Sequence, residues 1–147
     1  MAGAIWRPGR RIFSTAAILM LLLAVAHTAG NLAPGPVEPA QEKLFQDMNA
    51  VRVPVGMGMN PSVKDLYFTL VWTTAITFAG LGLISLTLAA ISETPERVLR
   101  RVSWINALWV GGVLIVCWIY RVAPPLISVV IIEVAVIGSL LRPARSS

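Results

Sequence analysis

The sequence predicts an all-α fold: an integral membrane four-helix bundle with a short amphipathic helix in its first outer loop. Of the 147 residues, 56% are hydrophobic and 13% are charged, and the mean hydropathy of +0.76 lies outside the usual range of soluble domains. Four long apolar runs alternate with polar segments. We therefore expect one membrane domain over 1–147, with spans at about 12–29, 66–91, 103–120 and 124–141 and an outer loop at 30–65.

Composition excludes several classes of function. The formal net charge is +5, but the basic residues lie at the ends of apolar runs rather than in one patch, so we expect no nucleic-acid partner. Cys117 is the only cysteine, which excludes an internal disulfide and a CxxC redox pair. The use of ten Arg against two Lys is associated with GC-rich bacterial genomes.

The first apolar run, 12–29, has two interpretations. Its 18 residues would form a helix of ~27 Å, close to the ~30 Å hydrocarbon core of a bilayer. A basic start, a leucine-rich middle and small residues at Ala24 and Ala26 also fit a signal peptide, removed as residues 1–26. Arg10 and Arg11 faintly resemble a twin-arginine signal. We favour an uncleaved helix because further spans follow.

The polar loop 30–65 has Pro and Gly clusters at both ends, which indicate turns. Between them, Leu44, Phe45, Met48 and Val51 recur at helical spacing within 38–53. The sequence therefore predicts a short amphipathic helix whose apolar edge rests on the bundle or in the membrane interface. Two roles stay open for this helix, filling the gap between spans or covering a site as a lid.

The second run, 66–91, has 26 residues and a helical length of ~39 Å, so it must tilt or project from the bilayer. Small and weakly polar residues recur along it near helical spacing. We expect this stripe to pack against other helices rather than to bind a ligand. The stripe consists of Thr69, Thr73, Thr77, Gly80 and Thr87.

A charged turn at 92–101 separates the second run from the third, in which Gly111 and Gly112 suggest a point of close helix contact. The N-terminus, this turn and the C-terminal tail carry eight basic residues, against four in the other connections. By the positive-inside rule, we expect a multi-pass protein of the inner (plasma) membrane with both termini cytoplasmic and the 30–65 loop outside.

Glu133 lies near the middle of the fourth run, ten residues beyond Ala123 and eight before Leu141. An ionisable group this deep in a membrane is costly and marks function by default. Its neighbours on its own helix are apolar, so we expect a partner on another helix, and Thr77 offers the only hydroxyl at similar depth. The alternative is a neutral glutamate that donates to a Thr or a backbone carbonyl and has no function.

His27, the only histidine, lies at the outer end of the first run, with Asn31 four residues later on the same helical face. An interfacial polar cluster of this kind needs no function. The alternative is a ligand-binding site that opens outward, with His27, Asn31, Thr73, Thr77 and Glu133 as candidate residues. His27 and Glu133 differ in depth by roughly 10 Å, so a ligand or water would have to bridge them.

Met57 and Met59, with Met48 and His27, offer soft ligands of the kind that suit Cu(I). Methionine is more often a packing residue, so we expect no metal site and no cofactor. The sequence contains no nucleophile triad, phosphate-binding loop or paired-carboxylate motif. We therefore name no catalytic residue and favour a binding protein over an enzyme.

The four-span layout, the His27-Thr-Ala-Gly30 motif and the Pro-flanked loop resemble those of small uncharacterised four-span bacterial inner-membrane proteins. That resemblance implies a location but no activity. Small multidrug transporters are similar in having four spans and one membrane glutamate, but theirs lies in the first span and they lack a long outer loop. The sterol-isomerase-like family also has four spans, yet its several membrane acids and histidines have no counterparts beyond His27 and Glu133.

These observations predict a membrane binding or accessory protein with an outward-facing cavity for an apolar or amphiphilic ligand. Its expected partners are membrane lipids, that ligand, and a second copy of the chain or a larger membrane complex. Two alternatives stay open: a proton-coupled small-molecule transporter that uses Glu133, and a membrane lipid-modifying enzyme that uses His27 and Glu133.

Overall fold

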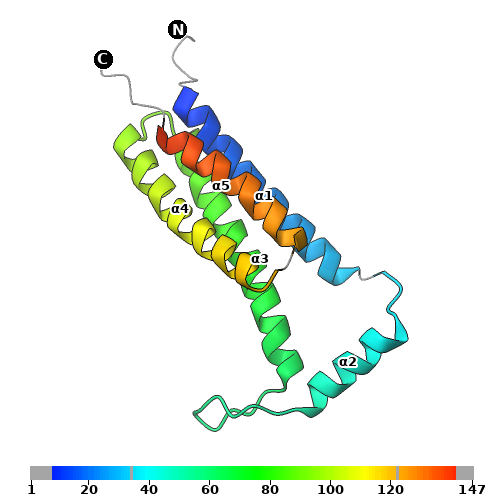
Figure 1. Cartoon of the computed structure of the whole chain (residues 1–147). Coiled ribbons are helices and arrows are strands. Elements are labelled where there is room, and N and C mark those ends of the chain that lie inside the picture. The colour runs from blue at the N-terminus through cyan, green and yellow to red at the C-terminus, as the bar shows by residue number, and fades with distance from the viewer. Residues whose placement is uncertain (1–7, 34, 122, 142–147) are drawn as a thin grey trace. The chain divides into compact units, whose positions relative to one another are not determined.

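The computed structural model describes residues 8–33, 35–121 and 123–141. These ranges form five helices, and no strand occurs in them beyond two isolated β-bridges. The predicted all-α class is confirmed. The helices are α1 (Pro8–Leu32), α2 (Pro39–Ala50), α3 (Val63–Ala90), α4 (Glu96–Ile119) and α5 (Ala123–Leu141) (Figure 1).

Three helices are long and apolar enough to cross a membrane: α1 from Gly9, α3 and α4. The apolar part of α5, Pro125–Leu141, is shorter. In an aqueous environment these helices would expose large apolar areas, since many of their Leu, Ile and Trp side chains are not covered by the rest of the chain. The helices therefore support an integral membrane protein.

The helices extend beyond the apolar runs predicted from the sequence. α4 begins at Glu96, so 96–101 is helical although the sequence suggested a charged turn. Pro95 stands at the N-cap with an extended backbone, φ −62° and ψ 141°, and the arginines that follow are good helix formers. Their long side chains can reach polar head groups from a helix that continues past the hydrocarbon.

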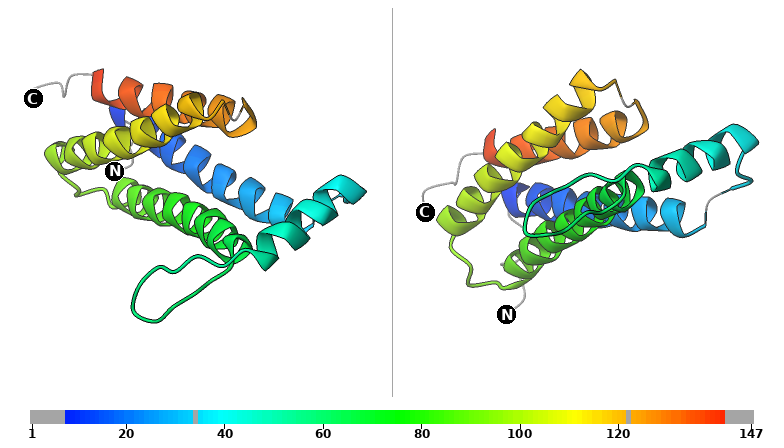
Figure 2. Two further views of the ribbon diagram at one scale, coloured as in Figure 1. Left: turned by 60° about the horizontal axis from the view of Figure 1, so that its bottom comes forward. Right: turned by 90° about the horizontal axis from the view of Figure 1, so that it is seen from below.

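The chain divides into two compact units. The bundle unit contains 1–23 and 78–147, and the loop unit contains 24–77. In the bundle unit, α5 turns back after Arg121 and packs antiparallel along α4 (Figure 2). The most deeply buried apolar side chains of this unit come from all four of its helices: Phe13, Ala17, Met20, Phe78, Val110, Val129, Ile132 and Val136.

Gly82 of α3 lies close to α1. A Cβ atom at this position would lie 2.8 Å from Cγ of Leu21 and 3.0 Å from the carbonyl oxygen of Ala17. Only a residue without a side chain fits there. A Cβ atom at Gly80 would meet nothing within 4 Å, so Gly80 has no such role.

The buried face of α3 is not the threonine stripe expected from the sequence. Thr69 and Thr73 are exposed, and the hydroxyls of Thr69 and Thr77 donate to carbonyls four residues earlier, at 2.8 and 2.7 Å. Because the helix itself satisfies these hydroxyls, they need no neighbouring helix. The buried positions instead alternate spacings of four and three residues: Val71, Ala75, Phe78, Gly82, Ser85 and Ala89.

In the loop unit, a helix forms within the expected 38–53 segment, but none of the residues of α2 is buried. α2 contacts the start of α3 through Phe45, whose ring centroid lies 6.2 Å from that of Tyr67 and 6.1 Å from that of Phe68. The Nζ atom of Lys64 lies 5.9 Å from the Phe45 ring centroid. Leu44, also expected on the packing edge, is 56% exposed.

Candidate functional site: an arginine pocket and buried polar groups

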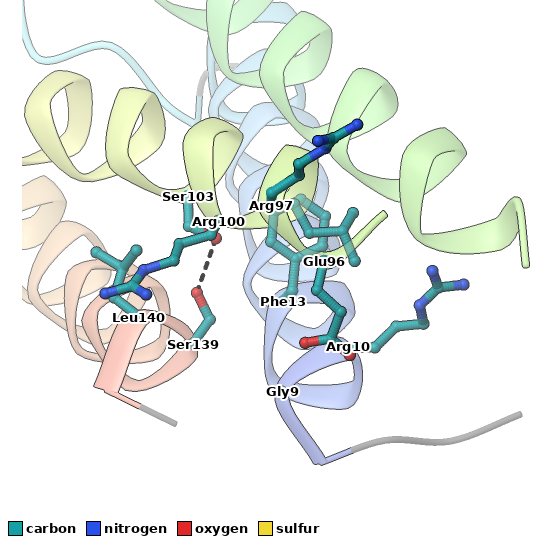
Figure 3. Close-up of a pocket in the computed structure, with 10 residues that line it drawn as sticks. Gly9, Arg10, Phe13, Glu96, Arg97, Arg100, Ser103, Ser139 and Leu140 are labelled. Atoms are coloured by element: carbon teal, nitrogen blue, oxygen red, sulfur yellow. Dashed lines mark hydrogen bonds between the residues drawn. The ribbon is translucent and has the colours of Figure 1, made fainter. Parts of the chain in front are cut away.

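The bundle unit contains a pocket where α1 and α4 begin and α5 ends (Figure 3). Its volume is about 210 Å³. Charged, apolar and hydroxyl side chains line it together, which suits a ligand that has both a charged and an apolar part. The charged residues are Arg10, Glu96, Arg97 and Arg100, the apolar ones Phe13, Leu99 and Leu140, and the hydroxyl-bearing ones Ser103 and Ser139.

Arg10 connects α1 to the end of α3. Its Nη1 atom donates to the carbonyl oxygens of Ala89 and Ile91 at 3.2 and 3.0 Å, and its Nη2 atom donates to that of Thr94 at 3.0 Å. Ala89 lies in the last turn of α3, whose carbonyls have no partner within the helix, while Ile91 and Thr94 belong to the connection that follows. A cation also suits the negative end of the helix dipole. Arg10 therefore has a structural role as well as a place in the pocket.

Arg97 and Arg100 lie one turn apart on α4, and both are exposed. Among the described residues, neither guanidinium group has a hydrogen-bond or ion-pair partner. Figure 3 shows that the two groups extend in different directions from α4. These side chains supply positive charge that the fold itself does not use.

Polar groups continue from the pocket into the apolar core. Ser139 Oγ lies 3.0 Å from Ser103 Oγ and 2.6 Å from the carbonyl oxygen of Val136. One turn further along α4, Asn106 Nδ2 donates to Ser85 Oγ at 2.9 Å, and both residues are buried. Asn106 Oδ1 is buried and has no partner among the described residues.

Glu133 is half-buried on α5 and faces α4. Its Oε1 atom lies 3.5 Å from the position that a Cβ atom at Gly111 would occupy, so the missing side chain leaves room for the carboxylate. Its Oε2 atom is buried and has no hydrogen-bond partner in the described part of the chain. Gly112, paired with Gly111 in the sequence-based expectation of close contact, has nothing within 4 Å of its Cβ position.

The other four predicted site residues form two local pairs. Asn31 Nδ2 donates to the backbone carbonyl of His27 at 2.6 Å, and the imidazole Nε2 of His27 is buried without a partner among the described residues. Thr77 Oγ1 donates to the carbonyl of Thr73 at 2.7 Å. All four residues belong to the loop unit, whereas Glu133 belongs to the bundle unit.

The predicted soft-ligand residues do not assemble an obvious metal centre. The described ranges contain no group of three or more His, Cys, Asp or Glu side chains that could hold a metal ion. Met57 and Met59 are 96% and 55% exposed. Methionine side chains this open to solvent lack the enclosed arrangement of a soft-metal site.

Sequence reasoning missed the pocket and the buried Ser85–Asn106 pair. The sequence did contain a signal for the buried polar residues of α4. The spacings of four, three and four residues place two polar residues on its buried face, which consists of Leu99, Ser103, Asn106 and Val110. Arg10 gave no such signal, because its carbonyl partners lie far along the chain.

No protein-family model, curated protein or solved structure matches the chain. The resemblance to small four-span bacterial inner-membrane proteins stays a prediction from the sequence. Function is therefore inferred from the chemistry of the pocket and of Glu133.

Proposed function

We propose that this chain is a four-span protein of a bacterial inner (plasma) membrane that binds an amphiphile with an anionic head group. The observation that carries the proposal is the pocket, where three arginine side chains adjoin Phe13 and Leu99. Guanidinium groups bind phosphate and carboxylate with bidentate geometry. Basic pockets between membrane helices bind phospholipid head groups in the same way.

The size of the pocket supports a lipid-like ligand. Its volume of about 210 Å³ is below the ~300 to 1,000 Å³ of pockets that enclose a whole small molecule. A head group fits this space while acyl chains remain in the bilayer. The proposal is therefore a binding or accessory role rather than catalysis.

The length of α5 supports a fourth span, because its 19 residues give ~28 Å, close to the hydrocarbon thickness. Four spans put both termini on one side, and the charge bias assigns that side to the cytoplasm. The basic residues Arg7, Arg142 and Arg145, which contribute to this bias, lie outside the described residues. The pocket would then lie at the cytoplasmic leaflet, where anionic lipids are abundant. An anionic lipid is therefore available as a ligand.

We also propose that α1 is retained in the mature protein. Phe13, Ala16, Ala17 and Met20 are each at most 3% exposed, so α1 supplies a large part of the buried apolar surface. Removal of residues 1–26 would leave the bundle unit without these side chains. Mass spectrometry of the mature N-terminus tests this point, and a start near His27 would contradict it.

Native mass spectrometry of the protein released from phosphatidylglycerol or phosphatidylcholine nanodiscs tests the binding proposal. Wild type is expected to retain phosphatidylglycerol in preference, and Arg97→Gln and Arg100→Gln to retain several-fold less. Arg101→Gln is the matched control, since it removes the same charge one residue beyond Arg100 from a side chain that does not line the pocket. If all three variants lost phosphatidylglycerol equally, the preference would depend only on net charge, and the proposal would be overturned.

A proton-coupled transporter is the second candidate, and Glu133 favours it. A buried carboxylate oxygen that has no partner among the described residues, beside a glycine that leaves room for it, is suited to accept a proton. Glu133→Gln is expected to keep the fold and abolish substrate transport. A Glu133→Leu variant that is more stable and still complements a deletion strain would exclude this role.

Other sequence-based proposals remain. His27, Asn31, Thr73 and Thr77 are still the candidate residues for an outward-facing ligand site, and His27 with Glu133 for a lipid-modifying enzyme. Product formation from added lipid is the readout for the enzyme. Self-association or assembly into a larger membrane complex also stays a proposal, as does the lack of a nucleic-acid partner.

A further inference from the structure

The segment that precedes α3 forms a narrow antiparallel hairpin, called here the hairpin loop (51–63). Isolated bridges pair Arg52 with Ser62 near its base and Gly56 with Met59 at its tip. Its arms are also tied by backbone hydrogen bonds of 2.9 to 3.3 Å, donated by Val53 to Pro61, Val55 to Met59 and Val63 to Val51.

The base of the hairpin loop is fixed to the first turn of α3. Ser62 N–H donates to Asp65 Oδ2 at 2.9 Å, and Asp65 N–H donates to Ser62 Oγ at 3.1 Å, which is a capping box. Arg52 lies 3.8 Å from the same carboxylate. The hairpin loop therefore cannot change its height relative to the start of α3 without breaking these contacts.

The start of α3 has the residues of a membrane–water interface. Tyr67 and Phe68 pack with Phe45 of α2, and Lys64 lies over the Phe45 ring. Aromatic rings with a nearby cation are typical of the boundary between hydrocarbon and head groups. Figure 1 shows the hairpin loop leaving the start of α3 sideways rather than continuing its axis, so it stays near that level.

One face of the hairpin loop is apolar and is only partly covered by the described part of the chain. Alternate residues of an extended arm share a face, and Val55 and Met59 are opposed across the arms. Val51, Val55 and Met59 are each about half exposed, at 54%, 45% and 55%. Arg52, at the base, is the only charged residue of the loop.

Met57 at the tip conflicts with its own backbone. Its φ of 51° lies in the left-handed region, between Gly56 at 89° and Gly58 at 75°. Asn or Gly would suit both this conformation and water. Met57 instead projects a flexible apolar side chain that is 96% exposed. An apolar residue at a position that favours a small polar one indicates a contact outside the chain.

We propose that the hairpin loop lies in the lipid head-group region beside the start of α3 and inserts Met57 toward the acyl chains. The level of its base, its sideways course and its apolar face favour lipid over a soluble partner. Because the loop carries a single charge, neutral lipid is sufficient, in contrast to the anionic ligand proposed for the pocket.

Fluorescence quenching in nanodiscs of phosphatidylcholine that hold one copy of the full chain tests the proposal. Cys117 is replaced by Ala, and an environment-sensitive probe is attached at Met57→Cys or, as the matched control, at Asn60→Cys, whose position alternates with Met59. Iodide is expected to quench the Met57 probe several-fold less than the Asn60 probe. A lipid spin-labelled near the head group is expected to quench the Met57 probe more.

Equal access of iodide to both probes would overturn the proposal. Shielding of Met57 that appears only when two copies share a nanodisc would assign the tip to self-association and also overturn it. If Met57→Cys does not fold, a probe at Val55→Cys gives the same comparison with Asn60→Cys. A probe at Val55 as open to iodide as the Asn60 probe would equally reject lipid insertion.

Discussion

A side-chain hydrogen bond joins α3 and α4 in the bundle unit. Asn106 on α4 donates to Ser85 on α3, and the two side chains are 2% and 1% exposed. Polar groups in hydrocarbon must find partners within the protein, since water is absent. A slide of α4 past α3 by one turn would separate the Asn106 amide from the Ser85 hydroxyl. The pair therefore helps to fix the register of these helices.

A double-mutant cycle tests this role. Ser85→Ala leaves the Asn106 amide without an acceptor, and Asn106→Leu removes the amide, so Ser85→Ala should matter less in the Asn106→Leu background. We expect a coupling free energy of about 0.6 kcal/mol, the average for hydrogen bonds between membrane helices, and at most about 1.7 kcal/mol. Reversible unfolding in mixed micelles measures it. Thr87→Val, at an exposed site on the same helix, is the control, and zero coupling would mean that the bond contributes nothing.

The sequence alone is enough to predict the positions of some of these residues in the fold but not of others. The mid-span position of Glu133 follows from counting along an apolar run, and its lack of a partner on its own helix was evident. The buried place of Asn106 could have been found from its spacing to Leu99 and Val110. Arg10 could not, because no local pattern reports three acceptors that lie 79 or more residues away.

At the scale of helices, apolar length identified the spans while the ends and the packing faces were harder to predict. Ser62-x-x-Asp65 is a capping-box sequence and marks the start of α3, a signal that the breaker residues before it obscured. The threonine stripe was misleading because periodicity alone does not separate a packing face from threonines that bond their own helix. Gly82 could not be distinguished from Gly80 without the position of α1.

Alanine substitutions at these two glycines separate packing from helix propensity. Gly82→Ala should destabilise the protein by about 1 to 3 kcal/mol, because its Cβ atom would overlap Leu21 and the Ala17 backbone. Gly80→Ala meets nothing and should be neutral or stabilising by up to ~1 kcal/mol. Thermal unfolding in detergent compares them. Similar melting temperatures would argue against close α1–α3 contact at Gly82.

For the whole molecule, composition was enough to predict an all-helical membrane protein, and the three long apolar helices agree with that prediction. The number of spans depends on α5, whose apolar part is short. The pocket could not be predicted from the sequence because it combines residues from the beginning of α1, the beginning of α4 and the end of α5. Such a combination exists only after folding.

Reporter fusions test the proposed orientation. Alkaline phosphatase folds only outside the cytoplasm, so a fusion after Asn49 in α2 should be active and one after Pro95, ahead of α4, inactive. The basic residues in the first two turns of α4 should hold that side in the cytoplasm. A green fluorescent protein fused at the same two sites should give the inverse signal. Activity after Pro95 with none after Asn49 would reverse the topology.

The hydrogen bonds of Arg10 also require that one step of synthesis precede another during folding. Their acceptors lie 79, 81 and 84 residues further along the chain. At a synthesis rate of ~5 to 20 residues per second, these carbonyls are made roughly 4 to 17 s after Arg10. Throughout that interval the nascent first helix has a guanidinium group that only water or lipid phosphate can satisfy. The hydrogen bonds of Arg10 can therefore form only after the ribosome has completed α3 and the connection that follows it.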